Sequence, residues 1–98
     1  MLNFVPFLLG WAEGWISSGK TAPTLSSVQG DTSRPKTSAW LVVEGLEVAG
    51  QITVWDTGEC DLEAFDIETG VPKLQETRTV ASFEELASAI RLVVAICE

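Results

Sequence analysis

The stretch ITVWDTGECDLEAFDIETG, residues 52–70, alternates apolar and polar residues on both sides of a short polar turn. A period of two is typical of strands that bury one face. A three-residue turn over 56–58 places Gly58 where the backbone needs a positive φ. The register that follows pairs residues of like polarity: Ile52 with Leu62, Val54 with Cys60, and Thr53 with Asp61. The stretch therefore predicts an antiparallel hairpin with one apolar face.

Further strands are expected on both sides of this hairpin. AWLVVE, starting at Ala39, continues the period of two and leads into a turn at Gly45. VPKLQETRTV follows the hairpin, and Pro72 within it favours a strand start or an edge position. TLSSVQ is a possible short edge strand, with Leu25 and Val28 as its apolar residues. The sequence thus predicts an antiparallel meander of four to five strands.

Two amphipathic segments flank these strands and predict helices. In the first segment, Pro6 suits the first helical turn, and the following residues share one stripe: Phe4, Leu8, Trp11 and Trp15. The second segment begins with Ser82 and Glu85, the pattern of a capping box. Its apolar stripe has the same spacing: Leu86, Ile90, Val93 and Cys97. We therefore expect an α+β domain of two layers, a meander sheet flanked by an N-terminal and a C-terminal helix.

The length and composition favour one packed unit. Ninety-eight residues, 46% of them apolar, suffice for one small core, and half of that length would not fold alone. We expect a single domain over residues 1–98. The start of the chain, MLNFVPFLLGWAEGW, lacks the basic residues of a signal peptide and is too short to span a bilayer. A cytoplasmic protein is the expectation.

The charge balance is strongly acidic. Six Lys and Arg against fourteen Asp and Glu give a formal net charge of −8. Such a charge repels nucleic acid and anionic membranes and favours basic partners. We therefore expect neither nucleic-acid nor membrane binding. The alternative is that the acidity serves solubility alone.

Catalytic and metal-binding signatures are absent from the sequence. The chain has no His, which removes the commonest general base and the commonest metal ligand. Cys60 and Cys97 are far apart and form no CxxC motif, so both are expected to be buried, reduced thiols. Carboxylates on a solvated strand usually form only a polar surface, and their spacing here does not fit an EF-hand. The sequence predicts a protein that is not an enzyme and that binds no metal or cofactor.

Trp55 is the most informative residue for binding. If Ile52 and Val54 face the core, Trp55 shares the outer face with Asp61 and Glu63. An exposed Trp surrounded by carboxylates is typical of a binding hot spot. The alternative is that a helix covers this face too, which would make Trp55 and Phe65 core residues. The same alternatives apply to Trp40.

The hairpin also carries a family resemblance. The turn W-[DE]-[ST]-G-E-x-[DE], here residues 55–61, is followed by LEAFDIETG and later by a capped C-terminal helix. Together with the opening LLGWAEGWI, this pattern resembles the TriTu immunity proteins, which are found beside polymorphic toxins in bacteria. The outline covers most of the chain, and residues 52–70 are its specific part.

The resemblance implies an antitoxin that binds and blocks a cognate toxin domain. An acidic protein suits a basic, nucleic-acid-targeting toxin. From the residues alone, the expected partner-binding set combines one aromatic side chain with six carboxylates: Trp55, Asp56, Glu59, Asp61, Glu63, Asp66 and Glu68. Two other readings use the same acidic strands. One is an acidic adaptor or secretion chaperone without toxin inhibition, and the other is a small enzyme with a carboxylate pair.

Overall fold

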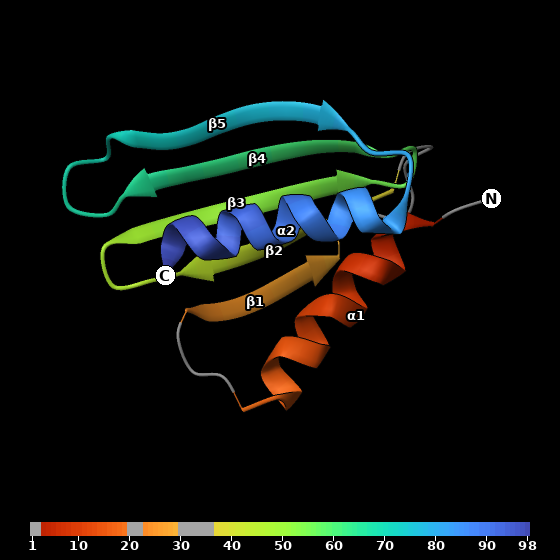
Figure 1. Ribbon diagram of the computed structural model, residues 1–98, viewed down its shortest axis with the longest axis horizontal. Coiled ribbons are helices and arrows are strands. Elements are labelled where there is room, and N and C mark those ends of the chain that lie inside the picture. Colours follow the sequence, from red (N-terminus) through yellow and green to blue (C-terminus); the bar gives the residue numbers. More distant parts are fainter. Residues whose placement is uncertain (1–2, 20–22, 30–36) are drawn as a thin grey trace.

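An antiparallel sheet and two helices make up the described part of this computed structural model, residues 3–19, 23–29 and 37–98 (Figure 1). The elements follow in chain order: α1 (Phe4–Ser17), β1 (Thr24–Gln29), β2 (Ser38–Glu44), β3 (Val48–Trp55), β4 (Glu59–Asp66), β5 (Pro72–Thr79) and α2 (Phe83–Cys97). Neighbouring strands in the sheet are also neighbours in sequence, in the order β1-β2-β3-β4-β5. The predicted α+β meander is confirmed, with five strands and with Pro72 starting the edge strand β5.

The β3–β4 hairpin has the predicted register. Its antiparallel pairs include Ile52 with Leu62, Val54 with Cys60, and Thr53 with Asp61. Gly58 in the turn has a φ of 99°, and its N–H donates to the Trp55 carbonyl at 2.9 Å. An L side chain is strained at such a φ, which explains the glycine.

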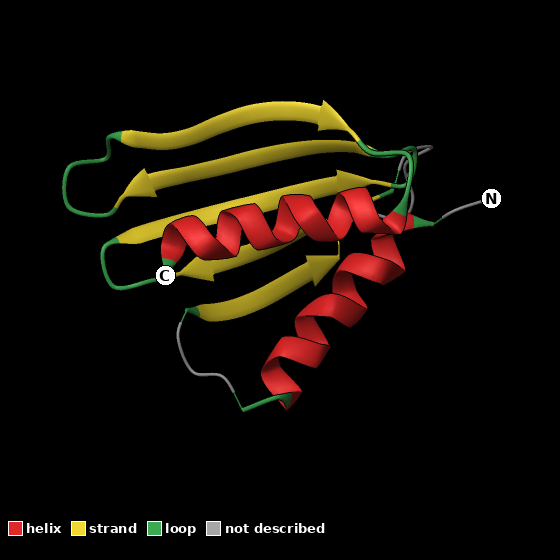
Figure 2. Ribbon diagram, viewed as in Figure 1, coloured by secondary structure: helices red, strands yellow, loops and turns green. Residues whose placement is uncertain are grey.

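Both helices pack on the same side of the sheet (Figure 2). α2 lies mainly on β3 and β4, and α1 lies mainly on β1 and β2. The predicted stripe of α2 is fully enclosed in the core: Leu86, Ile90, Val93 and Cys97. Ile52, Val54, Cys60 and Leu62 meet the helices from the sheet. In the described ranges, neither helix covers the opposite side of the sheet.

The buried stripe of α1 differs from the prediction. Phe4 and Leu8 are buried as expected, but Trp11 and Trp15 are only half-buried. Their rings stack on each other with centroids 5.8 Å apart, and the Trp15 indole N–H donates to the Pro23 carbonyl at 3.3 Å. The small side chain of Ala12 is buried instead, because it lets the helix approach the sheet while the large indoles pack at its flank.

The helix caps follow the sequence pattern with one change. Asn3 caps α1, and its side chain accepts a hydrogen bond from the Val5 N–H at 3.3 Å. Ser82 caps α2 by accepting from the Glu85 N–H at 3.1 Å. In the predicted capping box, the Glu85 carboxylate would accept in return from the Ser82 N–H. Here it accepts from the Ala81 N–H at 2.9 Å, one residue earlier, so the two bonds are not reciprocal, although both side chains still satisfy a backbone N–H at the helix start.

The strand predicted over TLSSVQ is β1. Leu25 is buried in the core, and the backbone register places Val28 opposite Trp40. The side chain of Val28 lies outside the described part of the structure, as do the basic residues Lys20, Arg34 and Lys36. Neither α1 nor α2 has the length and apolar character that a membrane crossing requires, over the residues described.

Candidate functional site

The side of the sheet turned away from both helices is the candidate binding surface. It carries alternate residues of the strands, in rows fixed by the strand register. We call this surface the open face, and its residues on β2 to β5 are Trp40, Val42, Glu44, Ala49, Gln51, Thr53, Trp55, Glu59, Asp61, Glu63, Phe65, Gln75 and Thr77. The candidate site therefore consists of strand residues that lie outside the hydrophobic core.

The aromatic residues of this sheet belong to the open face. Trp40 and Trp55 are half-buried, and Phe65 is 44% exposed. No helix formed by the described residues lies over them. The alternative in which a helix covers Trp55 and Phe65 is therefore wrong, and the outward orientation is confirmed.

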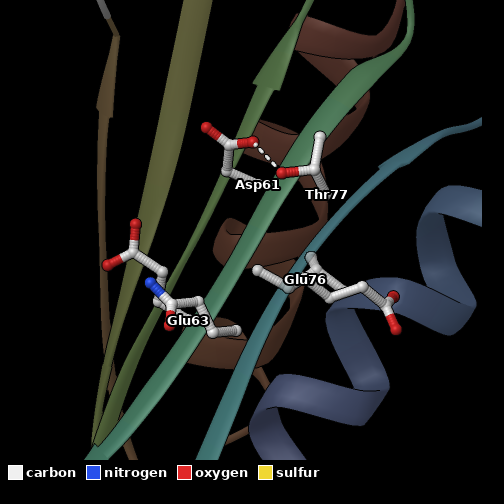
Figure 3. Close-up of a pocket in the computed structure, with 6 residues that line it drawn as sticks. Asp61, Glu63, Glu76 and Thr77 are labelled. Atoms are coloured by element: carbon white, nitrogen blue, oxygen red, sulfur yellow. Dashed lines mark hydrogen bonds between the residues drawn. The ribbon is translucent and has the colours of Figure 1, made fainter. Parts of the chain in front are cut away.

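Asp61 and Glu63 lie at the centre of the open face, on β4. Together with Gln75 and Thr77 of β5 they line a groove between these two strands (Figure 3). The Thr77 hydroxyl donates to Asp61 Oδ1 at 3.1 Å. The Glu63 carboxylate has no hydrogen-bond partner among the described residues. One central carboxylate is thus held in place by a hydrogen bond, and the other makes none to the described residues.

The positive charges of the described residues do not neutralise this centre. Arg78 forms an ion pair and a hydrogen bond with Glu76. Glu76 points away from Asp61 and Glu63, from the opposite side of β5 (Figure 3). Within the described ranges, no Lys or Arg forms an ion pair with Asp61 or Glu63. The described basic residues therefore leave the charge of these two carboxylates uncompensated.

The remaining predicted acidic residues divide between the two ends of the hairpin. Asp56 in the turn and Glu59 at the start of β4 lie at the same end as Trp55. Asp66 and Glu68 lie at the other end, where β4 turns into β5. The Thr69 N–H donates to Asp66 Oδ1 at 2.9 Å, and this bond lowers the pKa of Asp66. Asp66 therefore has a structural role in its turn, and the predicted set is not one cluster.

Sequence reasoning missed the part of the open face that β2 contributes. Val42 and Glu44 were absent from the predicted set, and Trp40 was left undecided. Val42 pairs with Gln51 and Glu44 pairs with Ala49, so both continue the rows that contain Glu63 and Phe65. The signal was present in the sequence, because these residues alternate with the buried Leu41 and Val43.

The open face offers no reactive group beyond carboxylates. The described residues contain no group of three or more His, Cys, Asp or Glu side chains placed to hold a metal ion. Both cysteines are buried and unpaired, on the core side of the sheet. The arrangement fits binding of another molecule by charge and apolar contact.

The thiols are expected to be unreactive in the folded protein. Burial raises the pKa of Cys60 to about 11 and also raises the pKa of Cys97, so the nucleophilic thiolate is scarce at pH 8. We expect both to react with Ellman's reagent at least about 100-fold more slowly in the native protein than in denaturant. The rate for Cys60 should rise with pH until about pH 11. Equal rates in the two states would contradict the burial of these side chains.

Comparison with known proteins identifies a family for this chain. The sequence model of the family described as "Immunity protein TriTu" matches residues 12–96, from the second half of α1 to the last turn of α2. The matched range includes every strand of the open face. A comparison with curated proteins gives no match.

Proposed function

Because the chain belongs to the TriTu family of immunity proteins, we propose that it neutralises a cognate bacterial toxin domain by binding it. The toxin would belong to a polymorphic toxin system, and the complex would form in the cytoplasm, one to one, without catalysis or a cofactor. The observation that carries this proposal is the open face, where Asp61 and Glu63 form no ion pair with any described Lys or Arg and lie on the same side of the sheet as the exposed Phe65.

We propose further that the toxin is basic and attacks nucleic acid. An enzyme that binds the phosphate backbone needs a cationic surface. An acidic face is steered toward such a surface and competes there with phosphate groups. The formal charge of −8 gives this chain the appropriate sign.

The proposed interface centres on Asp61 and Glu63. Trp55, Asp56 and Glu59 extend it at the β3–β4 turn, at one end of the open face. Asp66 and Glu68 extend the negative potential at the opposite end, where they would contact the partner only at its margin. A rim charge contributes mainly to the association rate, so these two residues should matter less than the central pair.

A pull-down from the native host tests this proposal. The tagged protein is recovered at low and at moderate salt, and the retained proteins are identified by mass spectrometry. We expect one basic toxin-like protein in a one-to-one complex that weakens as salt is raised. Several clients of moderate affinity would favour an acidic adaptor or secretion chaperone, and no retained protein would contradict the antitoxin role.

A further inference from the structure

The open face contains an apolar hollow on β2, β3 and β4, close to the end where β4 turns into β5. Most of the residues that line it are apolar, namely Val42, Ala49, Gly50, Phe65 and Ile67. Its polar lining is the amide side chain of Gln51 and the carboxylates of Glu44 and Glu63. The hollow arises from the row in which Ala49 pairs with Glu44 on one side and with Phe65 on the other. A methyl group between two long side chains leaves space above the sheet.

Large apolar side chains are exposed at this hollow. Phe65 is 44% exposed and Ile67 is 49% exposed. Both lie at its wall, where a bound side chain would bury them. Exposed apolar residues that surround a concave surface mark binding sites more often than isolated ones do.

The charges around the hollow define the chemistry of its partner. Glu44 and Glu63 line the hollow, and the described residues around it include no Lys or Arg. Glu63 has no hydrogen-bond or ion-pair partner in the described part of the chain. An apolar side chain that enters the hollow therefore gains contact area, and Lys or Arg residues next to it can pair with the two carboxylates.

We propose that this hollow takes one apolar side chain of the toxin, flanked in the toxin sequence by Lys or Arg, and that it is the energetic centre of the interface. This inference rests on the proposed function. The carboxylates of the open face, Asp61 and Glu63 foremost, steer the encounter, whereas the apolar lining of the hollow sets the lifetime of the complex. Residues that bury apolar area in a pocket chiefly slow dissociation, and rim charges chiefly speed association.

Two substitutions test the hollow in opposite ways. Phe65→Ala removes the wall, and Ala49→Leu fills the space with no change of charge. Binding to the toxin domain that the wild-type protein retains is measured by surface plasmon resonance. We expect each variant to raise Kd about 30-fold, mainly through faster dissociation, at both low and moderate salt.

Ile16→Ala is the matched control, because Ile16 is 57% exposed on α1, on the other layer of the protein. It should bind as the wild type does. Melting curves check that all three variants are folded. If the toxin is retained by the wild type but Phe65→Ala and Ala49→Leu bind within threefold of it, this inference is overturned and the proposed function stands. If the wild type retains no toxin, both are overturned.

A photocrosslink identifies the chemistry of the bound side chain. Benzoylphenylalanine is placed at position 67, beside the hollow, and the complex with the same toxin domain is irradiated. The adduct should map to an apolar toxin residue within three positions of a Lys or Arg. An adduct in a segment without Lys or Arg would overturn the proposed partner chemistry.

Discussion

The double substitution of Asp61→Lys and Glu63→Lys slows association with the toxin about 100-fold at low ionic strength, because steering by opposite charges accelerates encounter by that order. Both residues lie at the centre of the open face, and no ion pair within the described residues compensates their charge. The association rate is measured by stopped-flow fluorescence at several salt concentrations. The difference from wild type should shrink to a few-fold near 0.5 M salt, where charges are screened within about 5 Å.

The control for this experiment reverses two carboxylates on the helices. Glu13→Lys with Glu98→Lys changes the net charge by the same amount, and both residues are exposed, Glu13 within α1 and Glu98 directly after α2. If steering came from net charge alone, the two double variants would associate equally slowly. A larger effect at Asp61 and Glu63 assigns the steering to the open face, and unchanged association of that variant would contradict the electrostatic proposal.

Replacing Gly50 with alanine is expected to reduce the free energy of unfolding by about 2–3 kcal/mol, the upper part of the range for an overpacked core. A Cβ at Gly50 would lie 2.7 Å from the Glu63 carbonyl oxygen and 2.9 Å from Val93 Cγ1. The first contact is backbone of the adjacent strand and the second belongs to the buried face of α2, so neither moves aside easily. The melting temperature should fall by about 10–20 °C, measured by circular dichroism.

Gly10→Ala provides the opposite case with the same chemical change. Gly10 is exposed within α1, and a Cβ there would meet nothing within 4 Å. Alanine favours the helix over glycine, so this variant should gain about 0.5–1 kcal/mol. If both substitutions changed stability by similar amounts, the close approach of α2 to β3 at Gly50 would not limit the packing.

The strands and their register could be predicted because their pattern is local. In the β3–β4 hairpin, polarity alternates and Gly58 marks the turn, so the pairs of Ile52 with Leu62 and Val54 with Cys60 follow directly. The position of α2 was predictable for the same reason, since Ser82 marks its start and the stripe from Leu86 to Cys97 is regular.

The features that escaped prediction depend on neighbours distant in sequence. The apolar pattern of a helix does not tell which of two adjacent positions faces the sheet. In α1 the pattern predicted that Trp11 is buried, whereas Ala12 is buried in the structure. The outward orientation of Trp55 depends on both helices packing on the same side of the sheet, which the sequence pattern does not specify. The hollow required the pairing of Glu44, Ala49 and Phe65 from three strands. These three residues are neighbours because of how the strands pair, and their spacing along the chain does not predict it.

The division of each strand between two faces has a consequence for how this protein can diverge. In β4, Cys60 and Leu62 hold the core, whereas Asp61 and Glu63 alternate with them on the open face. If the open face binds the toxin as proposed, mutations that alter partner specificity fall on different codons from those that maintain folding. A lineage could exchange one toxin for another through a few outward substitutions, with its thermal stability largely preserved. The same separation makes the scaffold suitable for directed evolution of new inhibitors.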